Sequence, residues 1–334
     1  MRKSFIFIFI IATVLLVGCG NTGETKNTSN TVTEVNEENN EGVNENDNDK
    51  KSSGAHASAE RDLDETLAQF PKEKVDKVIT TSVPIAEILH TLSITPVGVP
   101  TSTNPLPESF ANIDEIGSPM APDLEKMTDL EADLILSSNA LEDSLEESLE
   151  GMDLERAYLP TDSYEDLKLS LEALGIYFEK EDEANTLLQE IEENEASLKE
   201  ELAGKDLPSI LLIIGTADSF MVMSEESYLG SLINTFGAEN IATTELKVED
   251  RYSPINMESI IAADPDIVFV LSSLDHGASE DMYEKEIESS EAWKNLSAYK
   301  NDQIHTVDYS TYGVTSILNV NKALSEIAQY FNVE

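Results

Sequence analysis

The sequence predicts an α/β fold made of two doubly wound α/β lobes joined by one long helix. Three patterns indicate this fold. Short β-branched strands alternate with amphipathic helices in both halves of the chain, a long helical pattern separates the halves, and one helix–turn–strand unit occurs in each half. Alternation of strands and helices is typical of parallel sheets that helices cover on both faces.

The first half, residues 75–180, is expected to form the N-terminal lobe. Lys77–Thr81 is a β-branched run and predicts a strand, after which Ser82 can cap a helix with Pro84 in its first turn. Apolar residues then recur at helical spacing. Further strands are expected at 96–100, 133–137 and 157–159, and further helices at 124–130 and 164–174.

A single helix over residues 181–204 is expected to connect the lobes. Its apolar residues fall on one face, and neither Pro nor Gly occurs before Gly204. At 1.5 Å per residue such a helix is roughly 33 Å long. The C-terminal lobe, residues 205–334, is then expected to contain strands at 210–214, 267–271 and 304–307 and helices at 228–235 and 319–331.

An internal repeat links the two halves. Glu125 on a short predicted helix precedes Asp133 of a strand by eight residues, and Glu258 precedes Asp266 in the same way. The repeat predicts a pseudo-twofold pair of lobes. Chance repetition of a common helix–strand unit is the alternative reading.

Composition excludes several classes of function. The 334 residues include 66 Asp and Glu, 21 Lys and Arg, four His and one Cys, with a formal net charge of −45. Nucleic-acid binders need a basic surface, so no nucleic-acid partner is expected. One Cys rules out an internal disulfide and thiolate metal clusters. The sequence has no nucleophile elbow, no paired-His zinc motif and no Gly-rich phosphate loop, so we expect no enzyme.

The N-terminus has the pattern of a secretory signal peptide. Arg2 and Lys3 precede the apolar run from Phe5 to Gly18, which is shorter than the ~20 residues that a membrane-spanning helix needs. The end of the run, Leu16–Cys19, resembles a lipobox, in which the Cys carries the lipid. An ordinary signal peptide that happens to contain a Cys is the alternative.

Residues 1–18 are thus expected to be a signal peptide and residues 19–60 a lipidated Cys19 followed by a disordered tether. Residues 21–60 hold nine Asn, nine Asp or Glu and no aromatic residue. A segment of this composition buries too little apolar surface to offset the conformational entropy that it would lose on folding, so it is expected to be disordered. The expected location is the cell membrane, with the protein lipid-anchored on the extracytoplasmic face.

Residues 75–334 resemble the substrate-binding lipoproteins of ABC importers for ferric siderophores, cobalamin and heme. The resemblance lies in Val78–Ser82, in Pro96–Val99, in both Glu-to-Asp units and in the long helix. It implies a type III periplasmic-binding-protein-like fold, with a shallow cleft between lobes that close little. It also implies an ABC permease and an ATPase as partners, with no catalytic residues.

Within that family, Val97–Ser102, Gly117–Glu125 and His276-Gly277 look like a heme-binding member. This likeness implies heme as the transported ligand and surface proteins that donate it. It further implies that Met120 and His276, one from each lobe, are the axial ligands of the heme iron, a known pairing. Both residues are also expected at carboxyl ends of strands, where α/β sheets bind ligands.

The propionates of heme need local anion binding in so acidic a chain. The helix end at Pro84 offers backbone amides, and five neighbouring residues are candidates to help: Ser82, Val83, Thr101, Ser102 and Thr103. Ordinary capping and turn formation is the alternative for them. Met223 and Tyr228 could line the ligand pocket or pack in the core, and the sequence does not decide between these two roles.

Glu125 and Glu258 are implied by the resemblance to dock onto the permease, although each could be a solvated helix residue. A ferric siderophore or cobalamin is the alternative ligand. It would call for Arg or aromatic residues in the cleft, and after Arg61 only Arg156 and Arg251 are available, with Trp293 as the single Trp.

Overall fold

The computed structural model describes residues 62–215, 220–254, 256–272, 285, 287 and 289–331. The expected signal peptide, Cys19 and the tether lie outside the described residues, and so does His276. Within the described part, no helix combines the length and the apolar character needed to cross a lipid bilayer.

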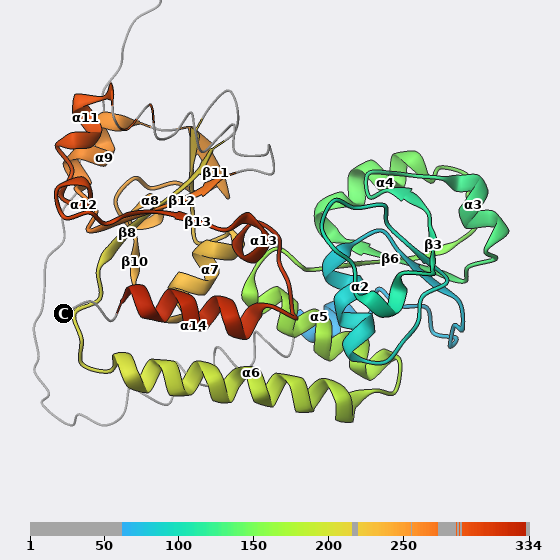
Figure 1. The fold of residues 1–334 in the computed structure, drawn as a ribbon. Coiled ribbons are helices and arrows are strands. Elements are labelled where there is room, and N and C mark those ends of the chain that lie inside the picture. Colours follow the sequence, from blue (N-terminus) through green and yellow to red (C-terminus); the bar gives the residue numbers. More distant parts are fainter. Residues whose placement is uncertain are drawn as a thin grey trace, which may run out of the picture. The chain divides into compact units, whose positions relative to one another are not determined.

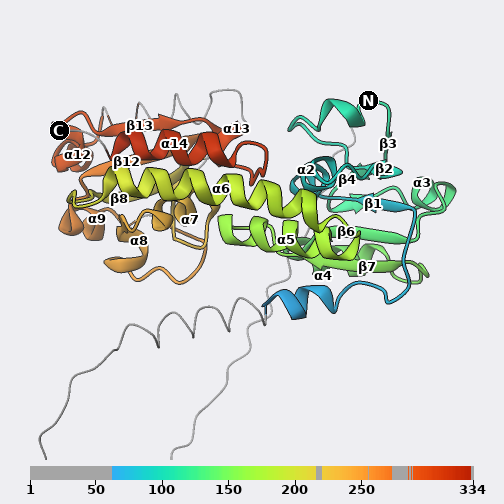
Figure 2. The same cartoon turned by 90° about the horizontal axis from the view of Figure 1, so that it is seen from below.

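The first sheet is parallel throughout and has the strand order β3-β2-β1-β6-β7 (Figure 2). We call this sheet and its helices lobe 1. Its strands are β1 (Val78–Thr80), β2 (Gly98–Val99), β3 (Asp114–Glu115), β6 (Leu134–Ser138) and β7 (Glu155–Leu159). A small antiparallel hairpin, β4 (Gly117–Ser118) and β5 (Ala121–Pro122), stands apart from it.

Helices cover both faces of this sheet, because alternate strand residues point to opposite sides. Leu134 and Leu136 belong to the buried cluster that includes α2 (Val83–Thr91) and α5 (Tyr164–Tyr177). Ile135 belongs to a second cluster with α3 (Leu124–Asp129) and α4 (Glu142–Ser148). Single 3₁₀ turns, η1 (Glu108–Phe110) and η2 (Asn139–Leu141), complete lobe 1, and residues 62–67 are helical ahead of β1.

The second sheet is mixed and has the order β11-β9-β8-β12-β13, with β10 also paired to β8. We call it and its helices lobe 2. The strands are β8 (Ser209–Gly215), β9 (Phe220–Met223), β10 (Glu239–Asn240), β11 (Tyr252–Pro254), β12 (Ile267–Ser272) and β13 (Ile304–Val307). β8, β10, β12 and β13 are parallel, whereas β9 runs antiparallel to both β8 and β11.

The antiparallel strands β9 and β11 differ from the expectation that the second half repeats the first. β9 is a run of only four residues, too short for its period to distinguish a strand from a helix. β11 contains Pro254, which is compatible with an edge strand and not with a central one. β9 forms a hairpin with the preceding strand β8, whereas β11 depends on β9, which is distant from it in the sequence.

Lobe 2 is also covered on both faces. One face carries α7 (Tyr228–Thr235) and α14 (Val320–Tyr330). The other carries α8 (Ile241–Thr244), α9 (Met257–Ala263), α11 (Glu291–Lys294) and α12 (Ser297–Lys300), around the buried Trp293. The short helix α13 (Tyr309–Tyr312) follows β13. Helices thus cover both faces of each sheet, which confirms the predicted α/β fold class.

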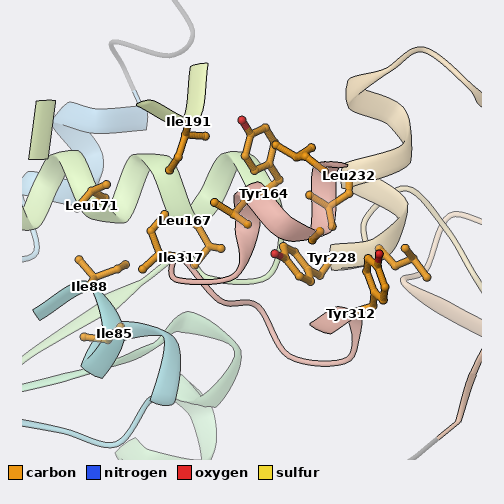
Figure 3. Close-up of a cluster of buried hydrophobic side chains, with 14 of the residues drawn as sticks. Ile85, Ile88, Tyr164, Leu167, Leu171, Ile191, Tyr228, Leu232, Tyr312 and Ile317 are labelled. Atoms are coloured by element: carbon orange, nitrogen blue, oxygen red, sulfur yellow. The ribbon is translucent and has the colours of Figure 1, made fainter. Parts of the chain in front are cut away.

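The long connecting helix is α6 (Glu181–Leu202), and it runs beside both α5 and α14 (Figures 1 and 2). Ile191 at its centre is fully buried. One continuous apolar cluster contains Ile88 and Leu171 from lobe 1 together with Leu232 and Ile317 from lobe 2 (Figure 3). Separating the lobes would expose this apolar surface to water, which costs a free energy of ~25 cal/mol for each Å². The shared core therefore limits hinge motion.

The predicted repeat is present in three dimensions. The Asp133 amide donates to the Lys77 carbonyl (2.7 Å), and the Lys77 amide donates to Asp133 Oδ2 (2.9 Å). In lobe 2 the Asp266 amide donates to the Ser209 carbonyl (3.0 Å), and the Ser209 amide donates to Asp266 Oδ2 (2.9 Å). Each Asp therefore fastens the start of its strand to the start of the neighbouring parallel strand.

Candidate ligand-binding cleft

A cavity of about 340 Å³ lies where the strands of both lobes end. Its lobe 1 wall includes Thr81 to Pro84 after β1, Ser138 at the end of β6, and Thr161 and Asp162 after β7. Its lobe 2 wall includes Leu271 near the end of β12 and Gly313 to Thr315 after α13. This is the carboxyl edge at which α/β sheets bind ligands.

Hydroxyl groups on the lobe 1 wall are paired with one another. Thr81 Oγ1 donates to Ser137 Oγ (2.7 Å), and Thr161 Oγ1 donates to Ser138 Oγ (2.8 Å). Ser82 Oγ accepts the Ile85 amide (3.5 Å) as the cap of α2. These bonds hold the loops after β1, β6 and β7 together at the floor of the cleft.

The candidate propionate residues divide into two groups. Ser82, Val83 and Ser102 line the cavity, and the Val83 amide lies in the first turn of α2, where amides have no helical carbonyl partner. Thr101 and Thr103 are exposed and do not line it. The hydroxyl of Thr101 donates to Glu115 Oε2 (2.7 Å).

Met120 lies at the tip of the β4–β5 hairpin, and 60% of its surface is exposed. It is not part of the cavity lining, but the preceding residue, Pro119, is. The tight hairpin explains why a Met between two prolines is held outside the core. On the other lobe, β12 ends at Ser272, four residues before His276.

Met223 and Tyr228 have both of the roles considered for them. They line the cavity, and they are buried in the core. Burial raises the pKa of Tyr228 well above its ordinary value. The buried Tyr228 hydroxyl makes no hydrogen bond of normal geometry within the described part of the chain, although the Ser316 backbone is nearby. Figure 3 shows Tyr228 and Tyr312 close together at this end of the shared core.

Two charged residues of the cleft were not assigned a role from the sequence. Arg251, just before β11, forms an ion pair with Asp162, which follows β7 in the other lobe. Among the described lining residues they are the only charged ones. Asp162 lies in the loop that follows β7, and a position just beyond the carboxyl end of a strand is the signal that could have identified it.

Most of the side chains that line the cleft are hydroxyl-bearing or apolar. Among the described residues, no group of three His, Cys, Asp or Glu side chains is placed to hold a metal ion. The described walls consist of hydroxyls, apolar groups, the amide of Asn104 and one ion pair. Such a surface suits a ligand with a broad apolar part and an anionic group.

The permease-docking candidates Glu125 and Glu258 are both exposed and lie in the first turns of α3 and α9. Their helices begin equivalently, since the cap residues Asp123 and Asn256 each stand two positions before the Glu. The structure thus places them as counterparts in the two lobes.

Comparison with known proteins places the chain among transport proteins. The model of the family described as periplasmic binding protein matches residues 78–311. The high-affinity heme uptake system protein IsdE of Staphylococcus aureus is 28% identical over 266 residues, which cover 76% of this chain and 87% of IsdE.

Solved structures agree with this result. An ABC transporter substrate-binding protein from Listeria monocytogenes EGD-e is 31% identical, with a TM-score of 0.70 over 78% of this chain and 99% of that one. S. aureus IsdE in complex with heme is 26% identical, with a TM-score of 0.70 over 78% and 100%. S. aureus SirA in complex with staphyloferrin B is 22% identical, with a TM-score of 0.66 over 79% and 96%, and shares the fold.

Proposed function

We propose that this protein, which belongs to the periplasmic binding protein family, is the heme-binding component of an importer for heme iron. The family assignment rests on the match over residues 78–311. The chain is thus a substrate-binding protein of an ABC importer, of the kind that serves heme, siderophores or cobalamin, and such proteins work with a permease and an ATPase. The choice of heme is the proposal.

The observation that carries the proposal is the exposure of Met120 beside the cleft. Methionine is usually buried, yet this side chain is 60% exposed on a rigid hairpin tip next to the cavity wall. A thioether held at such a place is suited to bind heme iron. The 28% identity to IsdE supports the same ligand.

In this proposal Met120 supplies a sulfur from lobe 1 and His276 an imidazole from lobe 2. The propionates lie toward the first turn of α2, near Ser82, Val83 and Ser102. The same role for Thr101 and Thr103 stays a prediction, and it requires the Thr101 hydroxyl to leave Glu115. No catalytic step is involved.

The proposal includes the position of the protein in the cell. A lipid on Cys19 anchors the chain to the extracytoplasmic face of the membrane, and the tether of residues 19–60 lets the folded part reach both surface heme donors and the permease. The absence of enzymatic activity is part of the same proposal.

An absorption titration with hemin tests the function. The wild-type protein should shift the Soret band and saturate at one heme per chain. Met120→Leu keeps the size of the side chain and removes its sulfur, so it should alter the spectrum and weaken binding at least about tenfold, as should His276→Ala.

Matched controls are Met257→Leu on α9 and His90→Gln on α2, neither of which lines the cleft. Both should titrate like the wild type. An unshifted Soret band with the wild-type protein would overturn the heme proposal. A Met120→Leu protein with an unchanged spectrum would remove Met120 from it.

A ferric siderophore is the second candidate, and one observation favours it. The siderophore reading calls for an Arg in the cleft, and Arg251 lines the cavity. Calorimetric titration with hemin and with a ferric siderophore separates the two candidates. Tighter binding of the siderophore would support the second.

A further inference from the structure

The Arg251–Asp162 ion pair bridges the two lobes inside the cleft. The guanidinium Nη2 of Arg251 contacts Asp162 Oδ2, and the two residues are 89 positions apart. Their side chains are 36% and 23% exposed, so the pair is partly shielded and still within reach of a ligand. In a chain with a net charge of −45, one cation among the described lining residues is a distinctive feature.

Arg251 has hydrogen-bonding capacity that Asp162 does not use. A guanidinium has five N–H donors in a planar fork. The buried Nε of Arg251 has no hydrogen-bond partner among the described residues. Its backbone is held in place, because the Arg251 carbonyl accepts the Ser224 amide (3.1 Å). Asp162 is thus the partner that holds the guanidinium among the described residues, and the guanidinium can be transferred from it to another anion.

The Asp162 carboxylate is an anion already bound to the Arg251 guanidinium. The amides of Asp162 and Ser163 donate to Asp166 Oδ2 at 3.2 and 3.0 Å, which holds the loop after β7 without using the Asp162 side chain. The Asp162 carboxylate can thus leave Arg251 while the loop keeps its shape. Being partly exposed, the carboxylate can then be hydrated.

We propose that Arg251 is the anion-binding residue of the cleft and that Asp162 is a built-in competitor, which a carboxylate of the ligand displaces. This inference rests on the proposed function and assigns the propionates a cationic partner. The exchange replaces one charge-assisted bond by another. Only a ligand that carries an anionic group can repay the loss of the ion pair, so the pair selects against neutral ligands of the same shape.

Two substitutions with opposite effects test the inference on the full chain. Hemin dimethyl ester has the iron and the porphyrin ring of hemin, but its two propionates are methylated and uncharged. The affinities for hemin and for the ester are measured by absorption titration. Arg251→Gln should reduce the preference for hemin over the ester about tenfold. Asp162→Asn should raise the affinity for hemin about threefold or more, because it removes the competitor and its repulsion.

Matched controls are Lys180→Gln and Asp153→Asn, which change the charge equally outside the cleft lining and should leave the preference unchanged. A gain of affinity in Asp162→Asn cannot come from misfolding. Loss of hemin affinity in Asp162→Asn, or an unchanged preference in Arg251→Gln, would overturn the inference and leave the heme function standing.

If the wild-type protein binds neither hemin nor its ester, the heme function fails, and the same variants are then titrated with ferric citrate. Weaker binding by Arg251→Gln together with tighter binding by Asp162→Asn would support the anion exchange independently of heme. No binding of ferric citrate, or binding that neither substitution changes, would overturn it.

Discussion

The hydroxyl of Ser316 donates a 2.6 Å hydrogen bond to the carboxylate of Glu87, although 229 positions separate the two residues. Glu87 lies on α2 of lobe 1 and is only 7% exposed. Ser316 belongs to the loop ahead of α14 in lobe 2, and the Leu318 amide of the same loop donates to Glu87 at 3.5 Å. A buried carboxyl group therefore joins the two lobes.

Glu87 should make the stability of the protein depend on pH. Burial raises the pKa of Glu87 above its ordinary value of 4.5, an effect that the hydrogen bonds from Ser316, Leu318 and Ile317 only partly offset. The folded state thus holds this proton more tightly than the unfolded state. The resulting stabilisation is full below pH 4.5 and is lost as the pH rises through the raised pKa of the folded state.

Glu87→Gln removes this dependence, so its free energy of unfolding should improve relative to the wild type as the pH rises from about 4 to 8. Urea denaturation at several pH values measures the difference. Glu192→Gln, at an exposed position of α6, is the control and should follow the wild type. Parallel curves for Glu87→Gln and the wild type would contradict the prediction.

The contact between α5 and α6 should depend on one buried hydroxyl. Tyr164 is fully buried, and its hydroxyl donates to Glu195 Oε2 at 2.6 Å. Because the acceptor is charged, Tyr164→Phe should lower the free energy of unfolding by about 1.5 to 3 kcal/mol in urea denaturation. Tyr299→Phe, at a residue that is 38% exposed, should leave stability within about 0.5 kcal/mol. Equal effects of the two substitutions would show that the bond contributes nothing.

The repeated Asp residues should contribute similarly in the two lobes. Asp133→Ala leaves the Lys77 amide without its acceptor, and Asp266→Ala does the same to the Ser209 amide. Because these hydrogen bonds are exposed, each substitution should lower the free energy of unfolding by about 0.5 to 1.5 kcal/mol. Thermal unfolding of both variants, beside Asp153→Ala at an exposed position, measures this. A large effect in one lobe and none in the other would argue against functional equivalence of the repeats.

Reversing both charges at Glu125 and Glu258 should abolish uptake of the ligand without changing hemin affinity, if these residues dock onto the permease. Both side chains are exposed, and neither lines the cavity. Uptake by cells that carry the double Lys variant measures the effect. The same reversal at the exposed Glu192 and Glu200 of α6 is the control. Uptake that survives the first reversal would remove the docking role.

Local patterns predicted most of the fold. The helix α6 begins at Glu181 as expected and ends at Leu202, α7 spans Tyr228–Thr235, and β13 spans Ile304–Val307, as the periodicity indicates. The hydrophobic periodicity that identifies each of these segments lies within the segment itself. The strands β9 and β11 were missed because each is too short for its period to identify a strand, and because β11 pairs with β9, which is distant from it in the sequence.

The sequence by itself determined the alternation of strands and helices, the long connecting helix and the family resemblance, since each depends on neighbouring residues. Only the tertiary structure decided which side chains meet in the cleft. Arg251 contacts Asp162 across 89 positions, while Thr101, close to Ser102 in sequence, lies outside the lining. Contacts of this kind depend on how two sheets pack against one shared core, and local sequence patterns do not determine which residues of distant segments meet.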